Sequence, residues 1–101
     1  MLDIIKKSEN DTLTLQLSGR LDTDTASQLD DEVAAIPDQV KNFVIDMDDL
    51  EYVASSGLRV LLMASKNMRN RGGVCKMINV PDLIKEVFEM TGLTDVFTIV
   101  D

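Results

Sequence analysis

The segment between residues 43 and 62 restricts the possible folds most, because a strand pattern changes there into a helix pattern across a polar turn. Residues 43–45 are an apolar run typical of a buried strand, and the acidic residues that follow predict a turn: Asp46, Asp48, Asp49 and Glu51. Ser55, Ser56 and Gly57 come next, and the apolar residues after them recur at helical spacing. A strand, a turn and a helix in this order are typical of an α/β fold.

The two serines lie where this helix is expected to begin. The first turn of a helix leaves up to four backbone N–H groups unpaired and carries the positive end of the helix dipole, so it accepts a capping hydroxyl or a phosphate group. Serine is among the commonest N-cap residues, and spacing alone therefore favours capping. The same geometry also suits a phosphorylation switch, and the residues alone leave both interpretations open.

Two motifs occur in register with each other. Leu50–Leu62 contains an aromatic residue, Ser-Ser-Gly-Leu-Arg and Val-Leu-Leu, and the earlier segment Leu17–Asp22 contains Gly-Arg-Leu-Asp. Both resemble the STAS domain family, the anti-sigma factor antagonists, in which the earlier motif is a Gly-x-Leu-Asp strand end. The order of expected elements agrees with that family from about Ile4 to Val100. The resemblance therefore implies a single STAS domain over residues 1–101.

By this resemblance Ser55, two positions before Gly57, is the phosphoacceptor, and Ser56 is its competitor. The unmodified protein would bind an anti-sigma factor with serine kinase activity and so free a sigma factor. The kinase would then phosphorylate Ser55, and a PP2C-type phosphatase would reverse this. The residues predicted to bind the partner come from both motifs: Asp22, Thr23, Ala54, Ser55, Ser56, Gly57 and Arg59.

Two features of the second motif keep alternatives open. Ala54 departs from the acidic residue or serine that many members of the family have there, so a second interpretation is a STAS subunit of a lipid-handling ABC transporter or a signalling scaffold, without phosphorylation. Gly57 either leaves Ser55 accessible to a kinase or meets a requirement of backbone geometry.

Composition predicts one soluble cytoplasmic domain. The 101 residues are 45% hydrophobic and 28% charged, and they include neither an apolar run of the roughly 20 residues that span a membrane nor a signal peptide. The net charge of −8 disfavours direct nucleic-acid binding, which depends on clustered Lys and Arg. The single cysteine, Cys75, lies in a strand pattern and is interpreted as a buried, inert thiol.

The sequence does not support an enzyme, a metal site or a cofactor. It has no histidine, which excludes Ser-His-Asp and Cys-His catalysis. Residues 22–25 resemble the Asp-x-Asp-x-Thr motif of haloacid-dehalogenase-type phosphotransferases, and a second acidic group would have to complete a magnesium site: Asp46, Asp48 and Asp49. The chain is short for that family, and residues 18–20 separate the motif from its strand, so we favour turn and cap roles for these aspartates.

The remaining elements follow from periodicity. A short strand at Ile4–Ile5 and an alternating strand at Thr12–Ser18 predict an antiparallel hairpin with its turn at Asn10–Asp11. A helix should follow the possible cap residues 22–24 and should stop at Pro37. Four residues at steps of three and four form its apolar face: Ala26, Leu29, Val33 and Ile36.

Asn42–Met47 predicts a central strand covered on both faces. The helix after Ser55 should end at Gly72-Gly73, and Ser65 should be among its inward residues. Basic residues near its end complement the helix dipole: Lys66, Arg69 and Arg71.

A strand at Val74–Val80, a helix from Pro81 to Gly92 and a strand at Val96–Val100 complete the chain. These elements predict a mixed sheet with helices packed on it, and they place the Asp22 loop and the Ser55 turn at neighbouring strand ends.

Overall fold

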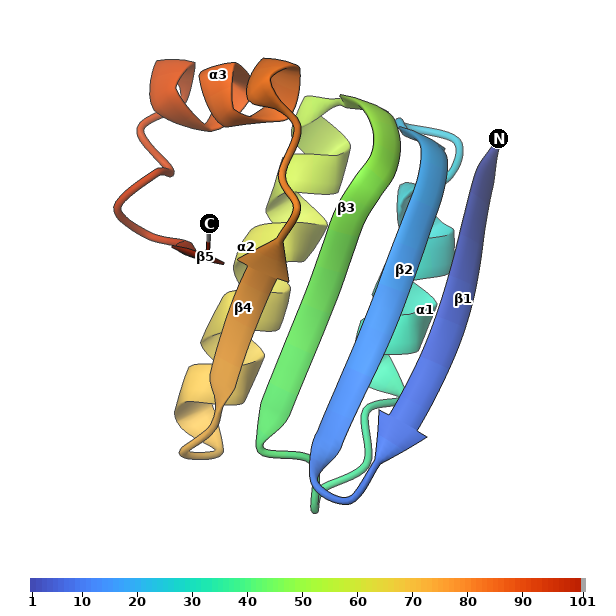
Figure 1. The fold of residues 1–101 in the computed structure, drawn as a ribbon, viewed down its shortest axis with the longest axis vertical. Helices are drawn as coiled ribbons and strands as arrows, with labels where there is room; N and C mark the ends of the chain where they lie inside the picture. Colours follow the sequence, from blue (N-terminus) through green and yellow to red (C-terminus); the bar gives the residue numbers. More distant parts are fainter. Residues whose placement is uncertain (101) are drawn as a thin grey trace.

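The computed structural model describes residues 1–100 as a five-stranded sheet with three helices (Figure 1). The elements, in chain order, are β1 (Leu2–Glu9), β2 (Thr12–Leu21), α1 (Ala26–Ala34), β3 (Asn42–Val53), α2 (Ser55–Asn70), β4 (Val74–Ile78), α3 (Asp82–Met90) and β5 (Thr98–Val100). The strands lie side by side in sequence order. The β1–β2 pair is antiparallel and every other pair is parallel, so the predicted hairpin, mixed sheet and α/β class are confirmed.

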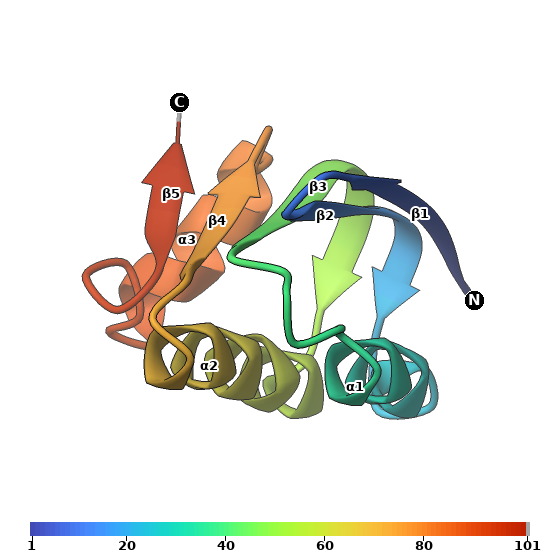
Figure 2. The same ribbon diagram turned by 90° about the horizontal axis from the view of Figure 1, so that it is seen from below.

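The main core lies between the sheet and two helices. Figure 2 shows α1 and α2 next to each other against the same face of the sheet. Strand β2 places Leu13, Leu15 and Leu17 toward this face, because side chains alternate along a strand and every second residue is buried. Helix α3 lies instead beyond the end of the sheet at which α2 begins (Figure 1). There Phe88 contacts Phe97 edge to face, with ring centroids 5.0 Å apart.

The prediction that the central strand is covered on both faces is wrong. Phe43, Ile45 and Met47 are fully buried, whereas Val44 and Asp46 between them are only partly buried. The reason is that α1 and α2 pack on the same side of the sheet (Figure 2). The opposite side of β3 therefore keeps polar residues such as Asp46.

The predicted acidic turn after this strand is also wrong. Strand β3 continues to Val53, and its acidic residues are strand residues because pairing with β2 continues through Ser18–Asp49 and Arg20–Tyr52. The pairing continues across two irregularities of register, one between Gln16 and Ser18 and one between Gly19 and Arg20. The hairpin strands are likewise longer than the apolar pattern predicts, since backbone pairing sets their length.

Other element ends differ by a few residues from their predicted positions. Helix α1 stops at Ala34, although Ile36 in the following loop is still buried. Strand β4 ends before Asn79, whose φ of 53° is incompatible with a continuing strand. Strand β5 begins only at Thr98, and the two preceding residues belong to the turn after α3.

Candidate functional site

The two sequence motifs meet at one end of the sheet. Leu21 and Val53 are paired where the parallel strands β2 and β3 end, and the backbone N–H of Ala54 donates to the Leu21 carbonyl at 2.8 Å. Beyond these strand ends, the Ser56 hydroxyl donates to Thr23 Oγ1 at 3.3 Å. The predicted proximity of the Asp22 loop and the Ser55 turn is therefore confirmed.

Ala54, and not a serine, occupies the N-cap position of α2. Its backbone is extended, with ψ of 170°, and its carbonyl accepts the first helical hydrogen bond, from the Leu58 N–H at 3.0 Å. Ser55 and Ser56 are the first two residues of the helix, and no side chain caps this helix within residues 1–100. The capping role predicted for the serines is wrong, because β3 runs directly into the residue before them.

The two serines differ in their surroundings. Ser55 is exposed, and its hydroxyl has no hydrogen-bond partner among the described residues. Ser56 is half-buried and bonded to Thr23. Arg59 is exposed one turn after Ser55, and residues four apart are neighbours on a helix surface. A free hydroxyl and a cation therefore share the open side of the helix start.

Gly57 is buried, and the structure shows a packing reason for glycine at this position. A Cβ atom at this position would lie 2.6 Å from Leu21 Cγ and 3.1 Å from the Leu21 carbonyl oxygen. The residue lies inside a regular helix, so no left-handed backbone conformation requires glycine. The absent side chain allows α2 to pack closely on the end of β2.

The Asp22 loop is held by the carboxylate of Asp22. Its Oδ1 accepts the backbone N–H groups of Asp24 at 3.0 Å and Thr25 at 3.1 Å, and also the Thr25 hydroxyl at 3.1 Å. Partial burial alone would raise the pKa of Asp22, but the hydrogen bonds from Thr25 and Asp24 outweigh it and lower this pKa. Thr23 is left exposed at the tip of the loop.

Arg20 and Tyr52 extend this surface, although sequence reasoning gave them no role. The guanidinium carbon of Arg20 lies 4.2 Å from the centre of the Tyr52 ring, and Arg20 Nε lies 3.8 Å from Asp22 Oδ2. These residues are partners in the register of β2 and β3. Both motifs contain them, but only the strand register shows that they face each other.

The acidic groups considered for a magnesium site are separated. Asp46 pairs with Gln16, which lies five residues before Leu21 on β2. Asp46 is therefore roughly 16 Å from the Asp22 loop, measured along the strands. Asp46 Oδ1 accepts the Asp48 N–H and the Asn79 side-chain amide, each at 3.1 Å. Within residues 1–100 no cluster of three or more His, Cys, Asp or Glu side chains is arranged to hold a metal ion.

Comparison with known proteins decides the family. The family model described as "Mlab, STAS domain" matches residues 5–101. The chain belongs to the STAS domain family. The anti-sigma-B factor antagonist of Listeria monocytogenes is 30% identical over 94% of this STAS domain chain and 84% of that protein. The anti-sigma-B factor antagonist of Bacillus subtilis is 28% identical over 94% of this chain and 86% of that protein.

Solved structures share the fold of this STAS domain. The anti-sigma factor antagonist SpoIIAA of Bacillus, in its unphosphorylated form, superimposes with a TM-score of 0.76 at 17% identity, over all of this chain and 88% of that one. Its phosphorylated form gives a TM-score of 0.75 at 17% identity, over all of this chain and 92% of that one. No helix within residues 1–100 is long and apolar enough to cross a membrane.

Proposed function

We propose that residues 1–101 form a single STAS domain that acts in the cytoplasm as an anti-sigma factor antagonist. It binds an anti-sigma factor with serine kinase activity, which frees a sigma factor, and phosphorylation of Ser55 switches this binding off until a PP2C-type phosphatase reverses it. The observation that supports this best is the exposed, unbonded Ser55 hydroxyl beside the Asp22 loop. The names of the relatives support the antagonist part of this proposal.

The surface around Ser55 suits a switch based on charge. A phosphate group adds about −1.5 to −2 charges and three acceptor oxygens. At Ser55 these oxygens would lie at the positive end of the α2 dipole. They would also lie four residues before Arg59, and an anion four residues N-terminal to a cation is the favourable arrangement on a helix. The fold therefore tolerates the phosphate. A partner interface fitted to a neutral hydroxyl does not, because an unpaired charge in an interface costs roughly 2–5 kcal/mol.

Ser55 suits the phosphoacceptor role better than Ser56. A kinase must reach the hydroxyl oxygen, and the half-buried Ser56 already donates its hydroxyl to Thr23. Phosphorylation of Ser56 would break that contact between α2 and the Asp22 loop. Ser55 can be modified without loss of any hydrogen bond within the described residues.

Phosphate transfer from a native lysate tests the modified residue. Purified wild type, Ser55→Ala and Ser56→Ala are incubated with native-cell lysate and ATP, and intact-mass and peptide mass spectrometry locate the phosphate. We expect phosphate on wild type and on Ser56→Ala but not on Ser55→Ala. Phosphate on Ser55→Ala and not on Ser56→Ala would assign the modification to Ser56 instead.

Affinity capture tests the partner. Wild type and Ser55→Asp, with Asp48→Asn as a control for altered charge elsewhere on the surface, are used to retain proteins from the same lysate. We expect wild type and the control to retain a kinase-like ATPase and Ser55→Asp to lose it. Capture of transporter components by all three forms would favour the transporter-subunit interpretation.

A further inference from the structure

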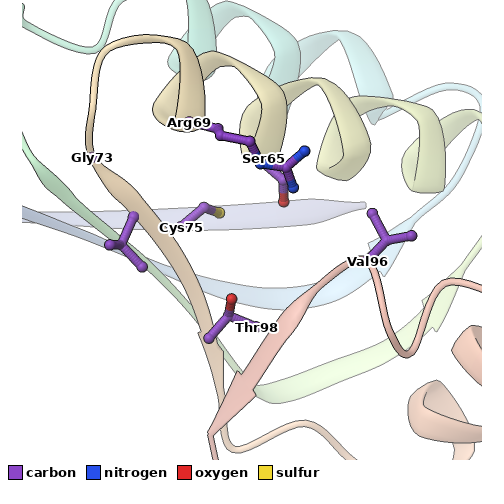
Figure 3. A pocket seen from close by; sticks show the side chains of 7 residues that line it. Ser65, Arg69, Gly73, Cys75, Val96 and Thr98 are labelled. Atoms are coloured by element: carbon purple, nitrogen blue, oxygen red, sulfur yellow. The ribbon is translucent and has the colours of Figure 1, made fainter.

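A second candidate site lies near the other end of α2. An open cavity of about 200 Å³ separates the second half of α2 from strands β4 and β5 (Figure 3). Its walls come from distant parts of the sequence: Ser65, Arg69, Val74, Cys75, Val96 and Thr98. Ser65 is about 15 Å along the helix from Ser55, so this cavity is separate from the partner surface.

Ser65 has a buried hydroxyl without a partner. The residue is only 7% exposed, its Oγ is fully shielded, and no hydrogen bond to it occurs within the described residues. Figure 3 shows this hydroxyl on the side of α2 that faces the cavity. Buried polar atoms in native proteins are nearly always hydrogen-bonded, and an unpaired one destabilises the fold. The orientation of Ser65 thus points to a ligand atom that completes its hydrogen bond.

Arg69 supplies positive charge at the same cavity. It lies one turn after Ser65, and Figure 3 shows its side chain extending along α2 over the cavity. It forms no ion pair with any residue from 1 to 100. Its full charge exceeds the partial negative charge of about half a unit at the helix C-terminus. An anionic group is therefore favoured here even though the whole chain is acidic.

The remaining walls are one hydroxyl and apolar groups. Thr98 directs its hydroxyl into the cavity from β5, and Val96 forms an apolar wall (Figure 3). Val74 is a second apolar residue that lines the cavity. Burial raises the pKa of the Cys75 thiol to about 11, and the Ser65 hydroxyl, which could donate to the thiolate, opposes this rise only in part. The thiol is therefore neutral at neutral pH, and beside the neutral thiol the Ser65 hydroxyl has no hydrogen-bond partner among the described residues. Among residues 1–100, no carboxylate lines the cavity to compete for Arg69. The cavity thus combines one cation, two hydroxyls and apolar walls.

We propose that this cavity binds a short-chain carboxylate, with Arg69 and Ser65 donating to its oxygens and Val74 and Val96 contacting its alkyl group. Carboxylates match the donor fork of arginine and the single donor of a serine hydroxyl. The volume lies below the roughly 300–1,000 Å³ of pockets for drug-sized ligands, so the ligand is small. This proposal is independent of phosphorylation at Ser55.

Titration of the ¹⁵N-labelled protein with butyrate, followed by NMR at constant ionic strength, tests the proposal. We expect saturable shifts of the Ser65, Cys75 and Thr98 amides and unchanged Ser55 and Ser56 amides. Arg69→Gln should weaken binding about tenfold and Ser65→Ala at least about threefold, because each removes a donor to a charged ligand.

Lys66→Gln is the matched control, because it also removes one positive charge from α2. Lys66 does not line the cavity but faces a groove between α1 and α2. Its butyrate affinity should equal that of wild type. The proposal fails if wild type shows no saturable shifts, or if all four proteins bind butyrate equally. Inorganic phosphate that binds as tightly as butyrate would also overturn it, because the apolar walls would then contribute nothing to recognition.

Discussion

Ser55 and Ser65 lie on the same helix, and neither hydroxyl has a hydrogen-bond partner in the described part of the chain, yet their surroundings are opposite. Ser55 is exposed at the first turn, beside a loop from another strand. Ser65 is buried against β4 and reached only through a cavity of about 200 Å³. A macromolecule can contact the first hydroxyl and only a small molecule the second. The position of a side chain relative to the sheet therefore decides which kind of partner it can have.

The largest expected difference between the two regions is in thiol reactivity. Cys75 beside Ser65 has a pKa of about 11, so at about pH 8 its thiolate fraction is roughly 200-fold below that of an ordinary cysteine. A cysteine placed at Ser55 lies at an exposed helix start, which favours the thiolate. We therefore expect Ser55→Cys, made together with Cys75→Ala, to react with an aromatic disulfide reagent at least about tenfold faster than wild type, because the lower nucleophilicity of a less basic thiolate offsets part of the difference in thiolate fraction. Equal rates would contradict the difference in burial.

Glycines at the two ends of α2 should differ in their cost of substitution. Gly57→Ala forces a Cβ against Leu21, which we expect to lower the free energy of unfolding by about 2 kcal/mol. Gly72 has φ of +76° and open space around it, so Gly72→Ala should cost only about 1 kcal/mol, from backbone strain. Urea unfolding of both variants measures this, and a larger loss for Gly72→Ala would refute the packing explanation for Gly57.

Alanine substitution of Ser55 and Ser65 should show that the two hydroxyls affect the free energy of unfolding differently. Ser65→Ala removes an unpaired buried polar group and should raise the free energy of unfolding by about 1 kcal/mol in the absence of added carboxylate. Ser55→Ala changes an exposed side chain and should stay within about 0.5 kcal/mol of wild type. Thermal and urea unfolding measure both values. Destabilisation by Ser65→Ala would mean that this hydroxyl already has a partner.

The smallest expected effect concerns the loop beside Ser55. The folded-state pKa of Asp22 lies below its ordinary value of 3.8, so its stabilising contribution is complete above that value and is lost as the pH falls through the lower folded-state pKa. Asp22→Asn should therefore lose less stability than wild type when the pH falls from about 6 to about 3. Asp48→Asn, exposed on β3, is the control and should retain the pH dependence of wild type. An unchanged pH dependence in Asp22→Asn would contradict the hydrogen-bonded role of its carboxylate.

The sequence determined the features that depend on near neighbours in the chain. Alternation in residues 12–18 identified β2 and its buried face, and helical spacing after Ser55 identified α2. The motifs at Leu17–Asp22 and Leu50–Leu62 identified the family and placed the candidate phosphorylation site at a helix start. The strand and the helix follow from local periodicity, because each side chain is sorted between water and core within one element. The family and the candidate phosphorylation site rest instead on the resemblance of the two motifs.

Only the tertiary structure decided which distant residues meet. The continued pairing of β3 with β2 turned a predicted acidic turn into strand and left Ala54 as the N-cap of α2. Contact with Leu21 explained Gly57, and strand order brought Thr98 opposite Ser65. Periodicity within a segment contains no information on such contacts, because they depend on the order and register of strands far apart in the sequence.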